Sequence, residues 1–224
     1  MDSINVTTTA AVGSAMVGAG LSIVGTLAYL LGIRRGSTTP HRGSWLVWSA
    51  VALIAACAHA AAGGRWGLVV LVVQAASTVT VLGVAVRGGV GGVAAGNVVL
   101  LGVAGVGIIG WQLVDDPLVA TCCVALADGA GLVAITPKIW REPDSETGTT
   151  YALAALSGLS AVVSVRSRDV ALLLFPAYFC LGNAAIALLI GCRRRWRGRS
   201  RVRDLGVVPS VGAVHERCPV TVQP

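Results

Sequence analysis

The sequence has little charge. Charged residues make up 12% of the 224 residues and hydrophobic residues 55%, whereas an ordinary globular domain carries about 25% charged residues. So few charges cannot cover the surface of a soluble domain. The scarcity therefore excludes a soluble enzyme or binding module as the main body of the chain, and it predicts an all-α integral membrane protein whose main partner is the lipid bilayer.

Lysine is almost absent, since Lys138 stands alone against sixteen arginines. Seven of the arginines lie in one run, 193–203, and the ten other basic residues balance the ten acidic ones. The net charge of +7 therefore belongs to the carboxyl-terminal tail and gives no support to a nucleic-acid-binding domain. We expect this run to hold the helix end inside the cell and to bind anionic lipid headgroups along Arg193–Arg203.

Charges are also missing from seven long stretches, and each of them reaches the length that a helix needs to cross a bilayer. The shortest, 147–165, is the weakest candidate. A membrane domain, 1–192, is followed by a basic tail, 193–224, which we expect to be disordered. The seven expected helices are 10–33, 45–64, 66–86, 90–113, 117–137, 149–165 and 170–192.

Basic residues are unevenly divided between the loops. With the amino terminus outside, the inner segments hold fourteen Lys and Arg residues and the outer segments hold three. All six tryptophans fall near the ends of the expected helices, where indole rings prefer the headgroup level. We therefore predict a multi-pass protein of the cell membrane with its amino terminus outside and its carboxyl terminus in the cytoplasm.

Motifs for catalysis and metal binding are absent. The six cysteines show no CxxC spacing and no pairing in an outer loop, and no HExxH motif occurs. We expect no structural disulfide, no metal, no other cofactor and no enzymatic activity.

Two inner loops resemble each other. The first reads AYLLGIRRGSTTPHRGSWLVWSA and the third reads LVAITPKIWREPDSETGTTYALAALSG. Each follows a hydrophobic helix with basic residues, a proline in a short polar loop, and an aromatic residue that starts the next helix. The aromatics, Trp45 and Tyr151, are 106 positions apart. This offset places the first three helices over the last three as two parallel three-helix repeats, with the fourth helix as a linker.

This plan of three, one and three helices resembles the PQ-loop and SWEET group of small transporters. Pro137-Lys138 stands where that group has its Pro-Gln pair, with Lys138 in place of Gln, and the first repeat has no such pair. The loops GSTTPHRGSWLVW and PKIWREPDSETGT also resemble those of a family of bacterial seven-helix membrane proteins. The resemblance implies a transporter that works by alternating access around a site at the middle of the membrane.

Three polar residues lie near the midpoints of their expected helices. Asp128 is the one acidic residue within a crossing, where a carboxylate costs about 2.5–3.5 kcal/mol to insert. Gln74 and Asn183 lie on counterpart helices of the two repeats, and the resemblance implies that such amides face the central pocket. We expect Gln74, Asp128 and Asn183 to bind substrate, with Asp128 also serving as a proton relay. The alternative for each is a packing role through hydrogen bonds between helices.

Two further features have open interpretations. His59 is a candidate proton relay, although a lone histidine in a helix is more often a packing residue. Gly88, Gly92 and Gly96 form a stripe of small residues that permits close helix contact. This stripe packs either within the protein or in a homo-oligomer.

Three functions compete at this stage. The first is a transporter for a small neutral solute, because amides offer donors and an acceptor to hydroxyl groups. The second is a seven-helix sensor or receptor, although a retinal-linked form is disfavoured because the seventh helix has no lysine. The third is a membrane scaffold without a ligand. The parallel repeats favour the transporter.

Overall fold

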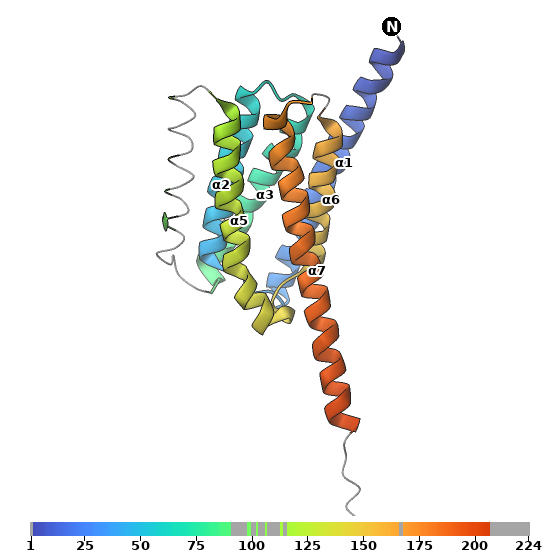
Figure 1. Ribbon diagram of the computed structural model, residues 1–224. Helices are drawn as coiled ribbons and strands as arrows, with labels where there is room; N and C mark the ends of the chain where they lie inside the picture. The colour runs from blue at the N-terminus through green and yellow to red at the C-terminus, as the bar shows by residue number, and fades with distance from the viewer. Residues whose placement is uncertain are drawn as a thin grey trace, which may run out of the picture.

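The computed structural model describes residues 2–90, 116–165 and 168–206, together with single positions between 98 and 113. These residues form α-helices, one short 3-10 helix at Pro143–Ser145, and one isolated β-bridge between His41 and Val90. Figure 1 shows the helices side by side in a bundle. The helices are α1 (Asp2–Arg34), α2 (Arg42–Ala61), α3 (Trp66–Gly88), α5 (Pro117–Arg141), α6 (Gly148–Ser164) and α7 (Val170–Gly206).

Five of these helices (α1, α2, α3, α5 and α7) are long and apolar enough to cross a membrane, whereas α6 is apolar but has only 17 residues. Large apolar side chains point outward from the bundle, among them Leu126 and Leu188, which are 69% and 68% exposed. In water such exposure would be costly, but in a bilayer these side chains contact lipid. The chain is therefore an all-helical, membrane-embedded protein. The expected helix 90–113, with Gly92 and Gly96, lies outside the described residues apart from a few single positions.

Several helix ends differ from those predicted. α1 begins eight residues earlier, at Asp2, because residues 2–9 contain no proline or glycine to stop it. α5 continues past Pro137 to Arg141, since one proline removes only one backbone donor and does not end a helix that is packed on its neighbours. Lys138 therefore lies in the last turn of α5 and not in a loop.

The largest difference concerns the tail. The expected disorder from residue 193 is wrong up to Gly206, because α7 continues 14 residues beyond position 192. Figure 1 shows this part of α7 leaving the bundle at the end opposite to the amino terminus. Arginine is a good helix former, and three arginines of the run donate to backbone oxygens of the segment 140–146. Arg193 bonds Trp140 O at 2.8 Å, Arg194 bonds Glu146 O at 2.6 Å, and Arg197 bonds Arg141 O.

The helices contact one another in a closed ring. α1 packs on α3, α3 on α2, α2 on α5, α5 on α7, α7 on α6, and α6 on α1. Two seams therefore join the group α1–α3 to the group α5–α7, one between α2 and α5 and the other between α1 and α6. Within each group the third helix along the chain lies between the first and the second.

The seam between α1 and α6 is held by small residues and hydroxyl groups. Ser157 Oγ donates to Gly18 O at 2.8 Å, and Thr150 Oγ1 donates to Gly25 O at 3.0 Å. The two helices approach closely because Gly18 has no side chain, since a Cβ there would lie 3.0 Å from Ser160 Cβ. Hydroxyl groups on a helix normally bond their own backbone, so these bonds to a neighbouring helix fix the seam.

Candidate functional site

The three polar residues predicted at the middle of the membrane line one cavity. Its volume is about 60 Å³, which is enough for several water molecules at 10–15 Å³ each. Gln74 comes from α3, Asp128 from α5 and Asn183 from α7, so both helix groups contribute to it. The lining is completed by Trp45, Trp48, Ala52, Thr78, Leu132, Thr150, Tyr151, Ala154, Phe175 and Phe179.

Each polar residue is fixed by one hydrogen bond and keeps further bonding capacity. Ser22 Oγ donates to Gln74 Oε1 at 2.6 Å, which leaves the amide nitrogen of Gln74 as a donor. Asn183 Nδ2 donates to Phe179 O at 2.9 Å, which leaves its oxygen as an acceptor. Tyr178 Oη donates to Asp128 Oδ2 at 2.9 Å. Asp128 and Asn183 are only 5% and 7% exposed, so these free positions are available to a molecule inside the protein.

Aromatic rings form much of the cavity wall. The chain has only eleven aromatic residues, and five of them line this cavity. The rings of Trp45 and Trp48 stand at 90° with centroids 5.3 Å apart, and those of Phe175 and Phe179 lie 6.0 Å apart. The indole N–H of Trp48 has no hydrogen-bond partner among the described residues. It faces Gly131, where a Cβ would lie 2.6 Å from Trp48 Nε1, so the glycine makes room for the ring.

A second cavity of about 30 Å³ adjoins the first, with which it shares Trp45, Gln74 and Thr78 among its lining residues. Tyr29 lines this second cavity. The hydroxyl of Tyr29 accepts from Trp45 Nε1 at 3.2 Å and donates to Glu146 Oε2 at 3.1 Å. Tyr29 therefore lies between the cavities and a polar network at the end of the bundle where α1 and α5 finish.

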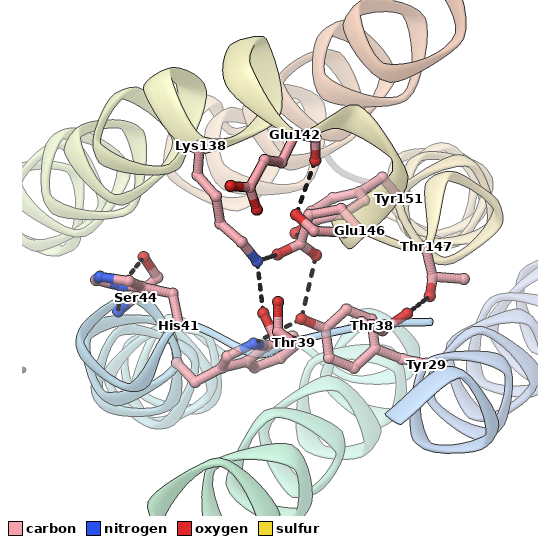
Figure 2. A network of polar contacts seen from close by, with 12 residues as sticks. Tyr29, Thr38, Thr39, His41, Ser44, Lys138, Glu142, Glu146, Thr147 and Tyr151 are labelled. Carbon is pink, nitrogen blue, oxygen red and sulfur yellow. Dashed lines mark hydrogen bonds and ion pairs between the residues drawn. The ribbon is translucent and has the colours of Figure 1, made fainter. Parts of the chain in front are cut away.

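Glu146 is the centre of this network, which we call the Glu146 network (Figure 2). Its carboxylate is 1% exposed. Lys138 Nζ forms an ion pair with Glu146 Oε1 and also donates to Thr39 O. Tyr151 Oη donates to Glu146 Oε2 at 3.2 Å. Burial raises the pKa of Glu146 above its ordinary 4.5, while the Lys138 ammonium and the two tyrosine hydroxyls oppose that rise.

The same network joins the loop after α1 to the loop after α5. Thr38 and Thr147 share a hydrogen bond of 2.5 Å, and Thr39 N donates to Ser145 O at 3.2 Å. Thr38 and Thr39 follow α1, whereas Ser145 and Thr147 lie between α5 and α6. The Glu146 network therefore ties the group α1–α3 to the group α5–α7 at this end of the bundle, beneath the cavity.

His59 does not join the three polar residues. It is 6% exposed and lines a separate cavity of about 10 Å³ with Thr121. Phe175 lines both cavities and stands between them. Among the described residues, a proton relay from His59 to Asp128 would therefore have to pass Phe175.

Several residues of the site are missing from the sequence-based prediction. Tyr178 and Ser22 were missed because a hydroxyl in a helix gives no sign of which partner it will bond. Glu146 was missed because its loop, EPDSETG, has the polar composition of a solvated turn. One available signal was its position five residues before Tyr151, the aromatic that matches Trp45.

Comparison with known proteins does not add to this picture: no family model, no curated protein and no solved structure matches the chain. The site must therefore be interpreted from its own geometry.

Proposed function

We propose that this protein is a membrane transporter of the PQ-loop and SWEET type, which moves a small solute by alternating access around the cavity at Gln74, Asp128 and Asn183. The amide pair makes a neutral, hydroxylated solute the expected cargo. The observation that carries the proposal is the cavity itself, because polar groups from both helix groups meet there inside an apolar bundle. Such groups are costly at the middle of a membrane unless water or substrate solvates them.

The ring of helix contacts supports two parallel repeats. If α1, α2 and α3 correspond to α5, α6 and α7, the order within each group is the same, and the seam between α2 and α5 corresponds to the seam between α6 and α1. The aromatics Trp45 and Tyr151 also line the same cavity, and both bond into the Glu146 network. In this proposal the expected fourth helix, 90–113, is the linker between the repeats.

The Glu146 network is the inner gate of the proposed transporter. It joins the two halves by the bonds from Tyr29 to Glu146 and from Lys138 to Thr39 O, and by bonds between the inner loops, so the cavity is closed at that end. Access from the cytoplasm requires Tyr29 to leave Glu146 and Lys138 to leave Thr39 O. A rocking motion of the two halves would break both bonds together, because each joins one half to the other, whereas the ion pair of Lys138 with Glu146 lies within one half.

Topology is the first test. The excess of basic residues in the inner segments predicts an outside amino terminus, which places the Glu146 network and the arginine run in the cytoplasm. Reporter fusions after Arg42, Arg87 and Arg199 should all report a cytoplasmic position. An external position at two of these three sites would contradict the topology and with it the inner gate.

Transport is tested with the purified protein in liposomes, across a panel of sugars, amino acids and vitamins. Uptake of one solute class should saturate and should fall at least about tenfold in Gln74→Ala and in Asn183→Ala, since each removes a bond to the solute. Thr80→Ala is the matched control, because Thr80 lies on α3 but is exposed and bonds only its own helix at Ala76 O. Equal losses in Gln74→Ala and Thr80→Ala would show that the cavity is not the transport site.

A further inference from the structure

We infer that the transported solute carries a positive charge, and that the cavity is a site for a small organic cation of the alkylammonium or methylammonium class. This inference rests on the proposed function. It leaves the alternating-access mechanism unchanged, but it replaces the neutral solute that the amide pair alone suggests. Three observations on the cavity carry it: its one charged residue, its aromatic wall and its size.

The first observation is the charge of the lining. Of the residues that line the cavity, Asp128 alone is ionisable with a charged form near neutral pH, and none is Lys, Arg or His. In the described part of the chain, no cationic side chain pairs with Asp128, since the ion pairs there are Lys138 with Glu146 and Arg194 with Asp144. A carboxylate buried in this way needs a counter-charge. A bound cation provides one, whereas an anionic solute would place a second negative charge beside it.

The second observation is the wall. Five aromatic residues line the cavity together with Asp128, and the rings of two of them, Trp45 and Trp48, stand perpendicular to each other. Aromatic faces attract ammonium groups, most strongly where water is excluded, and boxes of several rings are typical of sites for methylated ammonium ions.

The third observation is the size of the cavity, together with the number of free polar atoms that face it. The free amide nitrogen of Gln74 and the free oxygen of Asn183 can bond one hydroxyl or carbonyl group of the same solute. A cavity of about 60 Å³ has no room for a large solute, and a solute of the size of choline requires the two helix groups to move apart from the arrangement described above. The site therefore fits a compact cation with one polar group, in which the ammonium lies near Asp128 and the aromatic rings.

The test compares two probes of the same shape. Choline carries a quaternary nitrogen, and dimethylbutanol is its uncharged isostere, with carbon in place of that nitrogen. Binding to the purified full-length protein in detergent is measured by tryptophan fluorescence and by calorimetry. We expect choline to bind about tenfold or more tightly than dimethylbutanol. Equal or tighter binding of dimethylbutanol, or no binding of either probe, overturns the inference.

Two variants locate the effect. Asp128→Asn keeps the shape of the side chain and removes its charge, so the preference for choline should fall to within about threefold. Asp144→Asn, which changes an exposed carboxylate outside the cavity, is the control and should keep the full preference. If Asp128→Asn folds and still prefers choline as strongly as the parent protein, the inference is wrong.

Flux separates this inference from the proposed function. Uptake of a neutral polyol without uptake or binding of choline would overturn the cation site and leave the transporter standing. Binding of choline without flux of any solute into liposomes would support the cation site and overturn the transporter.

Discussion

Replacing Glu146 with alanine should destabilise the protein far more than replacing any exposed carboxylate. The Glu146 side chain is fully enclosed and accepts from Lys138, Tyr29 and Tyr151. Its loss leaves an ammonium group and two hydroxyls without their acceptor. Loss of one partner of a buried ion pair costs about 3–5 kcal/mol. For Glu146→Ala we expect a loss of about 3–4 kcal/mol in the free energy of unfolding, in the lower part of this range. The reason is that Lys138 keeps its bond to Thr39 O and that its side chain is 18% exposed.

The measurement is the free energy of unfolding in mixed detergent micelles, followed by circular dichroism. Asp144→Ala is the matched control in the same loop. Asp144 pairs with Arg194 at 3.3 Å, but the two side chains are 72% and 41% exposed, so its loss should cost less than about 1 kcal/mol. The double variant Glu146→Ala with Lys138→Met should recover at least about 1 kcal/mol relative to Glu146→Ala, since it removes the unpaired ammonium.

The refuting result is a small effect. If Glu146→Ala costs no more than Asp144→Ala, the Glu146 network does not hold the loop after α1 to the loop after α5. If the double variant recovers nothing, the cost of Glu146→Ala comes from lost packing and not from an unpaired charge.

Two further predictions concern the ends and contacts of helices. Neutral His41 Nδ1 accepts from Ser44 N at the start of α2, and burial, with help from the Lys138 ammonium, lowers the pKa of His41 below its ordinary 6.5. The cap is therefore present above pH 6.5, and about 1 kcal/mol of stability is lost as the pH falls through the lowered pKa. His41→Asn caps the helix without titrating, so it should remove this part of the pH dependence in unfolding measurements at several pH values. An unchanged pH dependence would contradict the cap. Gly158→Ala should cost about 1–3 kcal/mol, because its Cβ would lie 2.9 Å from the backbone nitrogen of Cys180 on α7. Gly83→Ala, which meets nothing within 4 Å, should cost nothing in the same assay, and equal effects of the two substitutions would refute the close contact between α6 and α7.

The membrane-embedded, all-helical fold could be predicted because it follows from long uncharged stretches, which report solvation by lipid directly. That Gln74, Asp128 and Asn183 lie at a common level of the bundle, where they line one cavity, could also be predicted, because level is a count of residues along a helix. The direction in which their side chains point could not be predicted, since each step along a helix rotates the side chain by about 100°. Only the packing of the six helices in the ring turns all three side chains inward.

The parts that were missed depend on contacts between distant segments. The tail was expected to be disordered from its composition, but Arg193 and Arg194 find backbone acceptors that lie about fifty residues earlier in the chain. Glu146 has the composition of a loop residue, and only the approach of Lys138, Tyr29 and Tyr151 buries it. Local patterns carry no information about such partners, so a charged residue in a loop is assigned to solvent by default.

The closed ring of helices has a consequence for the order in which the protein is assembled during its synthesis. α1 leaves the ribosome first, yet the residues that hold it, Thr150 and Ser157, lie 125 and 139 positions after their partners on α1. At a synthesis rate of about 5–20 residues per second, α1 waits on the order of 6 to 28 s for that neighbour. During this interval Gly18 and Gly25 face lipid or whichever helix is near. The last seam to form is thus the one built from the smallest side chains, and the ring closes only after α7 has followed α6 into the membrane.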